Sequence, residues 1–467
     1  MTALSIQGAS SSAGKSLVAT ALARWFARRG VRVAPFKGQN MSNNARVAHG
    51  GEIGVAQWLQ AHAARVEPDV RMNPVLVKPE GDTRSQVVLL GHPDHELSAL
   101  SWRERGPLLW PHVEESLRSL LAEYDLVVLE GAGSPSEVNL LDTDLANMRS
   151  ARVADAPVLL VADIDRGGAF AHLYGTWGLL DDADRPRVRG FLLNKFRGDE
   201  SLLAPAPALL RERTGVPTVG VLPWLEHGLP DEDGAARPRA APGRARVAVV
   251  RYPTASNLDE FRPLEQVAEL VWAGSPEDMD AADLVVLPGS KHVAADRAWL
   301  RERGFDDAIR ARVAGDARVL GICGGLQLLG ERFEDPAGVD GSGIGLGVLP
   351  LTTTFDADKL VRRTATRFAA LPAPWTPLSG LAVEGYEIRH GVSHADGLEP
   401  ALPDGLGWLS GPVLAVYVHG LFESPATVEA LVGSAPEAGL ERTFDALADA
   451  LDAHVDMVGV AALAGVA

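Results

Sequence analysis

The chain alternates short, wholly apolar runs with longer stretches in which apolar residues recur at helical spacing. Strands that are apolar on both faces belong to parallel sheets covered by helices on each side, so this pattern predicts an α/β protein. The expected strands include the runs Val31–Phe36, Leu126–Leu129, Val158–Val161, Val188–Leu193, Val247–Val250, Leu284–Leu287 and Val319–Ile322.

The alternation is interrupted between Gly228 and Arg244, where Pro, Gly and charged residues follow one another without a period. This composition is typical of a linker. We therefore expect an α/β domain over residues 1–232, a linker over 233–244 and a second α/β domain over 245–467.

The second domain contains a stretch of different character, Gly341–Gly411, which is richer in Gly, Thr and Pro and has a weaker helical period. We expect antiparallel strands and loops here, inserted before a last core strand at Val413–Val418.

Composition narrows the function classes. The formal net charge of −17 argues against nonspecific nucleic-acid binding, because neutralising phosphates needs a basic surface. The single cysteine excludes an intramolecular disulfide and fits a reducing compartment. No apolar run is long enough to span a bilayer, and the first residues lack the pattern of a signal peptide. We expect a cytoplasmic protein with no membrane or nucleic-acid partner.

That single cysteine, Cys323, lies between an apolar strand and a helix-like Leu-Gln-Leu-Leu, and glycines flank it. A tight turn of this kind lifts a thiol off the strand end, and backbone N–H groups there stabilise a thiolate or an oxyanion. A buried structural thiol is the alternative. His419 ends another apolar strand and is the expected proton acceptor. The expected oxyanion donors are the amides of Gly289, in a glycine turn after a strand, and Gly324.

A glycine-rich loop, Gly8–Ser16, joins the first apolar strand to the first helical stretch. Its small residues suit backbone amides that wrap phosphates, with Lys15 for the β- and γ-phosphates and Ser16 for Mg²⁺. Five residues separate Gly8 from Gly14, and this spacing resembles the dethiobiotin-synthetase-like branch of P-loop proteins. The residues expected to bind ATP are Gly8, Ser12, Gly14, Lys15, Ser16 and Asn194, the last of these through the base.

Acidic residues at two strand ends complete the expected nucleotide site, because ligands of open α/β sheets bind at the carboxyl ends of the strands. We expect Glu130 and Asp163 to join Ser16 at a magnesium ion. Two interpretations stay open for the loop with Asp163, Asp165 and Arg166. Its side chains bind metal or the transferred phosphoryl group, or the loop is only solvated.

The set of motifs and their order along the chain resemble those of the cobyric acid synthase family, the glutamine-dependent amidotransferases of cobalamin synthesis. The matching segments cover nearly the whole chain and are Gly8–Ser16, Gln39–Ala45, Glu130–Pro135, Asp163–Gly168, Asn194–Asp199, Tyr252–Leu264, Pro288–Lys291, Gly321–Gly330, Gly385–Ile388 and Tyr417–Gly420.

The resemblance implies a dethiobiotin-synthetase-like P-loop domain followed by a class I glutamine amidotransferase domain of flavodoxin-like fold. It also implies an activity: ATP, Mg²⁺ and L-glutamine would be used to amidate the b, d, e and g carboxylates of adenosylcobyrinic acid a,c-diamide. Acyl phosphates and ammonia would be the intermediates.

One position departs from triad-type glutaminases, which carry a Glu two residues after the catalytic His, where this chain has Leu421. The residue that orients His419 is therefore open between Glu423 and a backbone carbonyl. We expect Arg46, Arg166 and Arg197 to contact substrate carboxylates. The oligomeric state is not predicted.

Two other functions fit parts of the pattern. Cobyrinic acid a,c-diamide synthase shares the domain plan and the chemistry, but Gln39–Ala45 and Glu130–Pro135 favour cobyric acid synthesis. A nonenzymatic ATP switch of the partition type would need a signature Lys early in the loop, and Gly8–Ala13 contains none.

Overall fold

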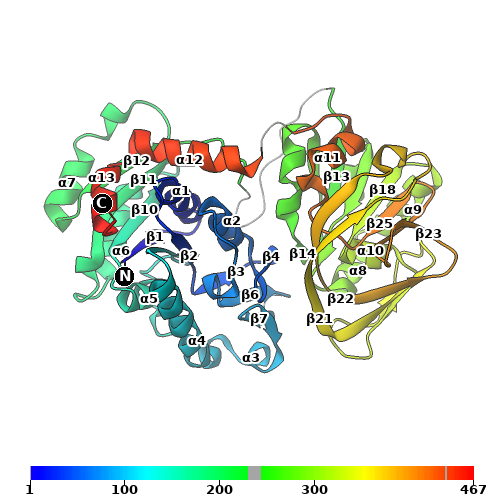
Figure 1. Cartoon of the computed structure of the whole chain (residues 1–467), viewed down its shortest axis with the longest axis horizontal. Coiled ribbons are helices and arrows are strands. Elements are labelled where there is room, and N and C mark those ends of the chain that lie inside the picture. Colours follow the sequence, from blue (N-terminus) through cyan, green and yellow to red (C-terminus); the bar gives the residue numbers. More distant parts are fainter. Residues whose placement is uncertain (1, 82, 230–242, 437–438, 467) are drawn as a thin grey trace.

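The computed structural model describes residues 2–81, 83–229, 243–436 and 439–466. They form two α/β domains that lie side by side, with the first half of the chain and the red C-terminal helices in one and the yellow segments in the other (Figure 1). The expected linker, 233–244, lies outside the described residues except for its last two positions.

The first domain is built on a six-stranded, all-parallel sheet in the order β12-β11-β10-β1-β9-β2. Its strands are buried almost throughout, as their apolar sequences require. Their bounds are β1 Thr2–Gly8, β2 Val33–Phe36, β9 Leu126–Glu130, β10 Val158–Asp163, β11 Val188–Phe196 and β12 Thr218–Pro223.

Helices cover both faces of this sheet, because alternate residues of each strand point to opposite sides. Leu4 and Ile6 pack with helices α1 (Lys15–Ala27) and α2 (Val55–Ala63). Ala3 and the neighbouring strands pack on the other face against the remaining helices. These are α4 Trp102–Glu123, α5 Met148–Val153, α6 Ala169–Leu179 and α7 Ala206–Thr214.

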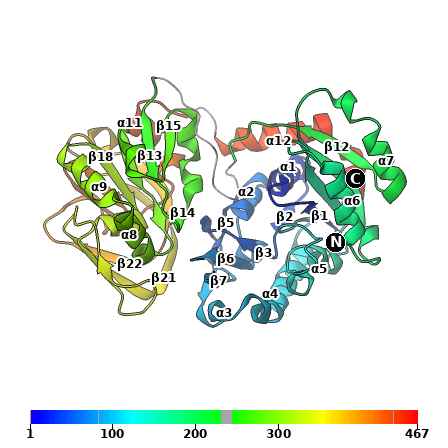
Figure 2. The same cartoon turned by 180° about the vertical axis from the view of Figure 1, so that it is seen from behind.

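A smaller lobe of this domain faces the second domain (Figures 1 and 2). It consists of a four-stranded sheet in the order β3-β6-β7-β8, a two-stranded hairpin β4-β5 and a short helix. The bounds are β3 Gln39–Met41, β4 Ala45–Ala48, β5 Gly51–Gly54, β6 Val75–Pro79, β7 Ser85–Leu89, β8 His92–Asp94 and α3 His95–Ala99.

The second domain is built on a seven-stranded sheet in the order β15-β13-β16-β18-β25-β24-β23, in which the first five strands are parallel. The bounds are β13 Arg246–Val250, β15 Glu269–Ala273, β16 Leu284–Leu287, β18 Arg318–Ile322, β23 Glu399–Leu402, β24 Gly407–Ser410 and β25 Val413–Val416. Its helices are α8 Val293–Glu302, α9 Phe305–Ala314, α10 Gly324–Leu329 and α11 Pro425–Val432.

The expected antiparallel insertion is present and includes the longest strands of the described chain, β21 (Leu351–Arg367) and β22 (Ala382–Ala395). They extend a second sheet with β19 (Arg332–Glu334) and β20 (Gly343–Ile344). A short antiparallel pair, β14 (Ala255–Ser256) and β17 (Gly289–Ser290), lies where the two domains meet.

The last helices return to the first domain, which differs from the division expected from the sequence. Helix α12 (Leu440–His454) packs on α1, and Phe444 is fully buried in the core that contains Leu4 and Ile6. Helix α13 (Met457–Leu463) joins the same core. Arg24 of α1 is buried and donates to Asp445 (Nε–Oδ1 2.8 Å). The chain thus crosses between the domains twice.

Among the described residues, no helix is both long enough and apolar enough to cross a membrane.

Candidate active sites

The glycine-rich loop lies at the carboxyl end of β1, directly before α1. Gly14 has a φ of 97°, and a Cβ placed on it would lie 2.0 Å from the side-chain amide nitrogen of Asn194. Only glycine fits this turn. The Asn194 amide donates to the carbonyl of Ala13 (2.9 Å), and the Lys15 ammonium donates to the carbonyl of Gly133 (3.2 Å). The loop is therefore held by the strand ends on both sides of β1.

Glu130 ends β9 beside this loop and is fully buried. Its Oε1 accepts from Ser16 Oγ (2.8 Å) and from the ammonium of Lys37 (2.8 Å), while its Oε2 accepts from the side-chain amide of Gln60. Hydroxyl and carboxylate oxygens this close together are the donor set that Mg²⁺ prefers. The residues present therefore fit a magnesium ion.

Asp163 ends β10 on the other side of β1, as expected. It accepts from Lys195 (2.9 Å), whose ammonium also donates to the Ser12 carbonyl (2.7 Å). Arg166 lies 3.6 Å from the same carboxylate and is 70% exposed. Asp163 thus helps to hold the loop from the side opposite Glu130, and its expected place at the metal stays a prediction.

Next to the loop is a cavity of about 390 Å³. Lys15, Lys37, Gln39 and Asn40 supply polar groups, and Trp102 supplies an aromatic wall. Met41, Leu140 and Leu141 also line it and are each more than 40% exposed, so its mouth is apolar.

In the second domain, Cys323 stands at the turn between β18 and α10 with a φ of 51°, a strained conformation for a residue with a side chain. Its N–H donates to the carbonyl of Val416 on β25 (2.8 Å). Its neighbours allow no side chains: a Cβ on Gly325 would lie 1.9 Å from the carbonyl of Leu287. The sequence Gly-Ile-Cys-Gly-Gly thus provides the elbow that was expected from it.

His419 follows β25 and is buried, and the structure brings it close enough to Cys323 for the thiol to raise the pKa of the imidazole. Its Nδ1 lies 2.9 Å from Oε1 of Glu260, and Glu260 Oε2 accepts from the Gly420 N–H (2.8 Å). The ring of Tyr386 stacks on the imidazole at 5.2 Å. Burial lowers the pKa of His419, but the negative charges of Glu260 and Cys323 outweigh it and raise that pKa to about 10.

Gly289 and Gly324 lie against this pair. A Cβ on Gly289 would be 2.9 Å from Cε1 of His419, and a Cβ on Gly324 would be 2.5 Å from the backbone nitrogen of Ser290. Gly289 therefore brings backbone close to the imidazole, and Gly324, directly after Cys323, brings it against Ser290; their role as oxyanion donors stays a prediction.

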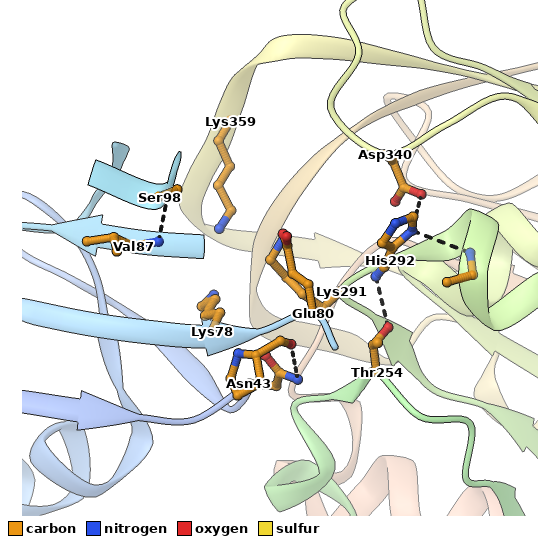
Figure 3. A network of polar contacts seen from close by, with 12 residues as sticks. Asn43, Lys78, Glu80, Val87, Ser98, Thr254, Lys291, His292, Asp340 and Lys359 are labelled. Carbon is orange, nitrogen blue, oxygen red and sulfur yellow. Dashed lines mark hydrogen bonds and ion pairs between the residues drawn. The ribbon is translucent and has the colours of Figure 1, made fainter. Parts of the chain in front are cut away.

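The cavity at Cys323 is walled by both domains. Asn43 and Lys78 come from the small lobe of the first domain, and Lys291 and Lys359 from the second (Figure 3). Lys291 donates to Glu80 across the boundary (2.9 Å). His292, next in the chain, is fixed between Asp340 (3.0 Å) and Thr254, as Figure 3 shows.

A buried cluster of charges joins the domains beside this cavity. Glu52 accepts from Lys78 of its own domain (2.6 Å) and from Lys359 of β21. Burial would raise the pKa of Glu52, but Lys359 and Lys78 lower it to about 2. Burial lowers the pKa of Lys359 to about 8. The domains are thus docked through a carboxylate that two ammonium groups share.

Comparisons with known proteins agree with this architecture. Residues 4–229 match the family model of the CobQ/CobB/MinD/ParA nucleotide binding domain, and residues 246–427 match that of the CobB/CobQ-like glutamine amidotransferase domain. A cobyric acid synthase of Paracidovorax citrulli is 57% identical over 477 residues, covering 97% of this chain and 96% of that protein. Those of Variovorax paradoxus and Polaromonas naphthalenivorans are each 54% identical, with 97% or more of each chain covered.

The chain belongs to the cobyric acid synthase family. It is a glutamine-dependent amidating ligase with a nucleotide-binding domain followed by a glutamine amidotransferase domain, so the expected fold class and enzyme class are confirmed.

In this family member, the three arginines expected at substrate carboxylates have protein partners. Arg46 is buried and pairs with Asp259 and Glu423. Arg166 lies near Asp163, and Arg197 pairs with Asp165 (3.3 Å). Arg46 therefore holds the two domains together, because a buried guanidinium between two carboxylates is already neutralised.

The residue that orients His419 is neither of the two that the sequence suggested. Glu423 pairs with Arg46, and Nδ1 of His419 meets the side chain of Glu260. Glu260 lies 159 residues before His419, in the 3₁₀ helix Leu258–Gln266. The only available signal was that Tyr252–Leu264 matches the family. Lys37, which pairs with Glu130, was also missed, although it directly follows β2.

Proposed function

We propose that this enzyme uses ATP and glutamine to convert adenosylcobyrinic acid a,c-diamide into adenosylcobyric acid, by amidating the b, d, e and g side-chain carboxylates. The observation that carries the proposal is the array Cys323–His419–Glu260 in a chain whose other domain holds a P-loop cavity. The relatives named above are cobyric acid synthases, which supports the same product. The single cysteine, which fits a reducing compartment, supports a cytoplasmic location.

The first site prepares the carboxylate. A carboxylate is a poor electrophile, and transfer of the γ-phosphoryl group makes it an acyl phosphate with a good leaving group. Lys15 and the loop amides neutralise and position the phosphates. Ser16 and Glu130 would hold Mg²⁺, which supplies charge neutralisation between the phosphates when it is bound.

The cavity beside the loop suits one corrin side chain at a time. Its inner wall carries the ammonium groups of Lys15 and Lys37, which attract a carboxylate, while Gln39 and Asn40 offer hydrogen bonds to an acid or an amide. The exposed apolar side chains at its mouth, including Met41 and Leu140, fit the face of a macrocycle that stays outside.

The second site releases ammonia. Nε2 of His419 takes the proton of Cys323, and the thiolate attacks the carboxamide carbon of glutamine. The amides of Gly289 and Gly324 stabilise the oxyanion. His419 then protonates the departing nitrogen, so that ammonia leaves a thioester, and water hydrolyses the thioester to glutamate. Ammonia must reach the acyl phosphate unprotonated, which the docked domains favour by keeping water out.

A substrate competition tests the proposal against the related diamide synthase. The purified chain is given MgATP, glutamine and equal amounts of cobyrinic acid and its a,c-diamide, and the products are identified by mass spectrometry. We expect the a,c-diamide to be consumed through successive acid-to-amide exchanges up to cobyric acid. Conversion of cobyrinic acid itself, with the a,c-diamide untouched, contradicts the proposal.

A further inference from the structure

Both ring nitrogens of His419 meet side chains from one short segment, Asn257–Glu260. The carboxylate of Glu260 contacts Nδ1 of His419, as described above. The amide nitrogen Nδ2 of Asn257 lies 3.2 Å from Nε2 of His419. Asn257 is buried, has a φ of 55° and lines the cavity of Cys323. The segment is thus in contact with both atoms through which His419 exchanges protons.

Three consecutive residues of the first domain hold that same segment. The side-chain oxygen of Asn44 accepts from the Leu258 N–H (3.0 Å). The N–H of Ala45 donates to Oδ1 of Asn257 (3.0 Å). Arg46 donates through Nε to Asp259 (3.0 Å). All three are buried, so these contacts are shielded from water.

The contact with Ala45 fixes which way the amide of Asn257 faces. A backbone N–H only donates, so the atom it meets is the amide oxygen, and the NH₂ group must face Nε2 of His419. An N–H donor there needs Nε2 as its acceptor, which favours the neutral imidazole with its proton on Nδ1, next to Glu260. It also engages the lone pair that must take the proton of Cys323.

Two influences on His419 therefore oppose each other. Glu260 and the charge on Cys323 favour the imidazolium, whereas the NH₂ group held by Ala45 favours the neutral ring. If Ala45 withdrew, the amide of Asn257 would be free to turn, and its oxygen would then accept from the Nε2–H of an imidazolium.

We propose that Asn257 is a positioning residue that sets the readiness of Cys323 according to the place of Ala45 in the first domain. With Ala45 on its oxygen, the NH₂ group of Asn257 faces Nε2 and opposes the transfer of the proton from Cys323 to that atom. Displacement of Ala45 releases the amide and removes this opposition, so that the proton moves from Sγ to Nε2 more readily. The inference rests on the proposed function for the roles of Cys323 and His419.

The position of Ala45 is tied to the first site. Gln39, Asn40 and Met41 line the cavity next to the P-loop, and the chain runs from them through Ser42 into Asn44. A corrin side chain that enters this cavity presses on β3, which ends at Met41 and is followed by β4, whose first residue, Ala45, contacts Asn257. Glutamine would then be hydrolysed chiefly when an acceptor is present.

The test uses the fact that Cys323 is the only cysteine of the chain, so alkylation by iodoacetamide reports its thiolate alone. The full-length protein and Asn257→Asp are compared at neutral pH. A carboxylate at this position accepts from Ala45 and from Nε2–H together, so we expect alkylation about tenfold faster than in the wild type. Addition of MgATP and cobyrinic acid a,c-diamide should accelerate the wild type and leave Asn257→Asp unchanged.

The control is Arg363→Ala, which removes an ion pair with Glu67 across the same domain boundary, and it should behave as the wild type. If Asn257→Asp does not fold, Asn257→Ala takes its place and must lose the response to the first-site ligands. Equal alkylation of wild type and folded variant overturns the inference, as does a wild type that is indifferent to those ligands while forming product. Faster alkylation of Asn257→Asp in a protein that makes no cobyric acid would uphold the link and refute the proposed function.

Discussion

At the residue scale, chemistry concentrates where the backbone is strained or side chains are excluded. Cys323 has a positive φ, and the glycines around it leave no room for a Cβ. These features are local in sequence, so the motif alone predicted the elbow. The partner of His419 was not predictable in this way, because Glu260 reaches it from the 3₁₀ helix Leu258–Gln266, 159 residues away in the sequence.

The role of Glu260 leads to a prediction for Glu260→Gln. Without the carboxylate, the imidazolium loses its counter-charge and the ring its orientation, so we expect glutaminase turnover to fall by about 10²-fold. Ammonium-dependent amidation should be unaffected, since the first site does not use this pair. Equal loss of both activities in a folded variant would show that Glu260 serves the structure only.

The same substitution has a pH-dependent effect on stability. The pKa of His419 is raised in the folded protein to about 10. The stabilisation from its pairing is thus complete below the unfolded value, about 6.5, and is lost as the pH rises through 10. Thermal unfolding should separate wild type and Glu260→Gln at pH 6 and bring them together above pH 10. A gap that is independent of pH would contradict this.

At the element scale, the apolar strands of both large sheets follow from the sequence. The run Leu284–Leu287 coincides with β16, and Val247–Val250 lies within β13. The small lobe was not predicted, because its strands are short and partly polar: β3 is Gln-Asn-Met, and β8 is His-Pro-Asp. Its hairpin, β4 and β5, lies against β21 and β22 of the second domain, a contact that no local pattern encodes.

The ion pair between Glu52 of this lobe and Lys359 of β21 leads to a prediction for the stability of Glu52→Gln. The change leaves Lys78 and Lys359 buried and without their shared counter-charge, which costs about 3–5 kcal/mol for buried pairs. We expect a lower melting temperature and a higher KM for glutamine, because both lysines line the cavity of Cys323.

The matched control is Glu67→Gln, which removes an ion pair with Arg363 across the same boundary. Both of those side chains are more than half exposed, so little change is expected. If the two variants lost the same stability, burial would not be the reason for the effect of Glu52.

At the scale of the whole molecule, each domain includes or contacts segments that are far from it in the sequence. The last helices, α12 and α13, pack on the first domain, and the small lobe of that domain walls the cavity of the second. The sequence predicted that α12 belongs to the second domain, and this was wrong. The helical period of α12 shows that one face is apolar, but it does not show which domain buries that face. The two domains are therefore one catalytic unit.

The division of labour in this unit predicts opposite outcomes for two variants. Lys15→Ala should abolish amidation from both glutamine and ammonium salts, because phosphate positioning is lost, but should keep glutaminase activity. Cys323→Ala should abolish the use of glutamine and keep turnover with ammonium salts. Product formation is followed with each nitrogen source. Retention of ATP-dependent product by Lys15→Ala would refute the nucleotide site.

The most direct test follows the nitrogen itself. Cobyrinic acid a,c-diamide is incubated with the purified chain, MgATP and glutamine labelled with ¹⁵N at its amide, and the corrinoids are analysed by mass spectrometry over time. The account predicts that each successive amide carries ¹⁵N until labelled cobyric acid accumulates. An unchanged corrinoid alongside hydrolysed glutamine, or amides without the label, would contradict it.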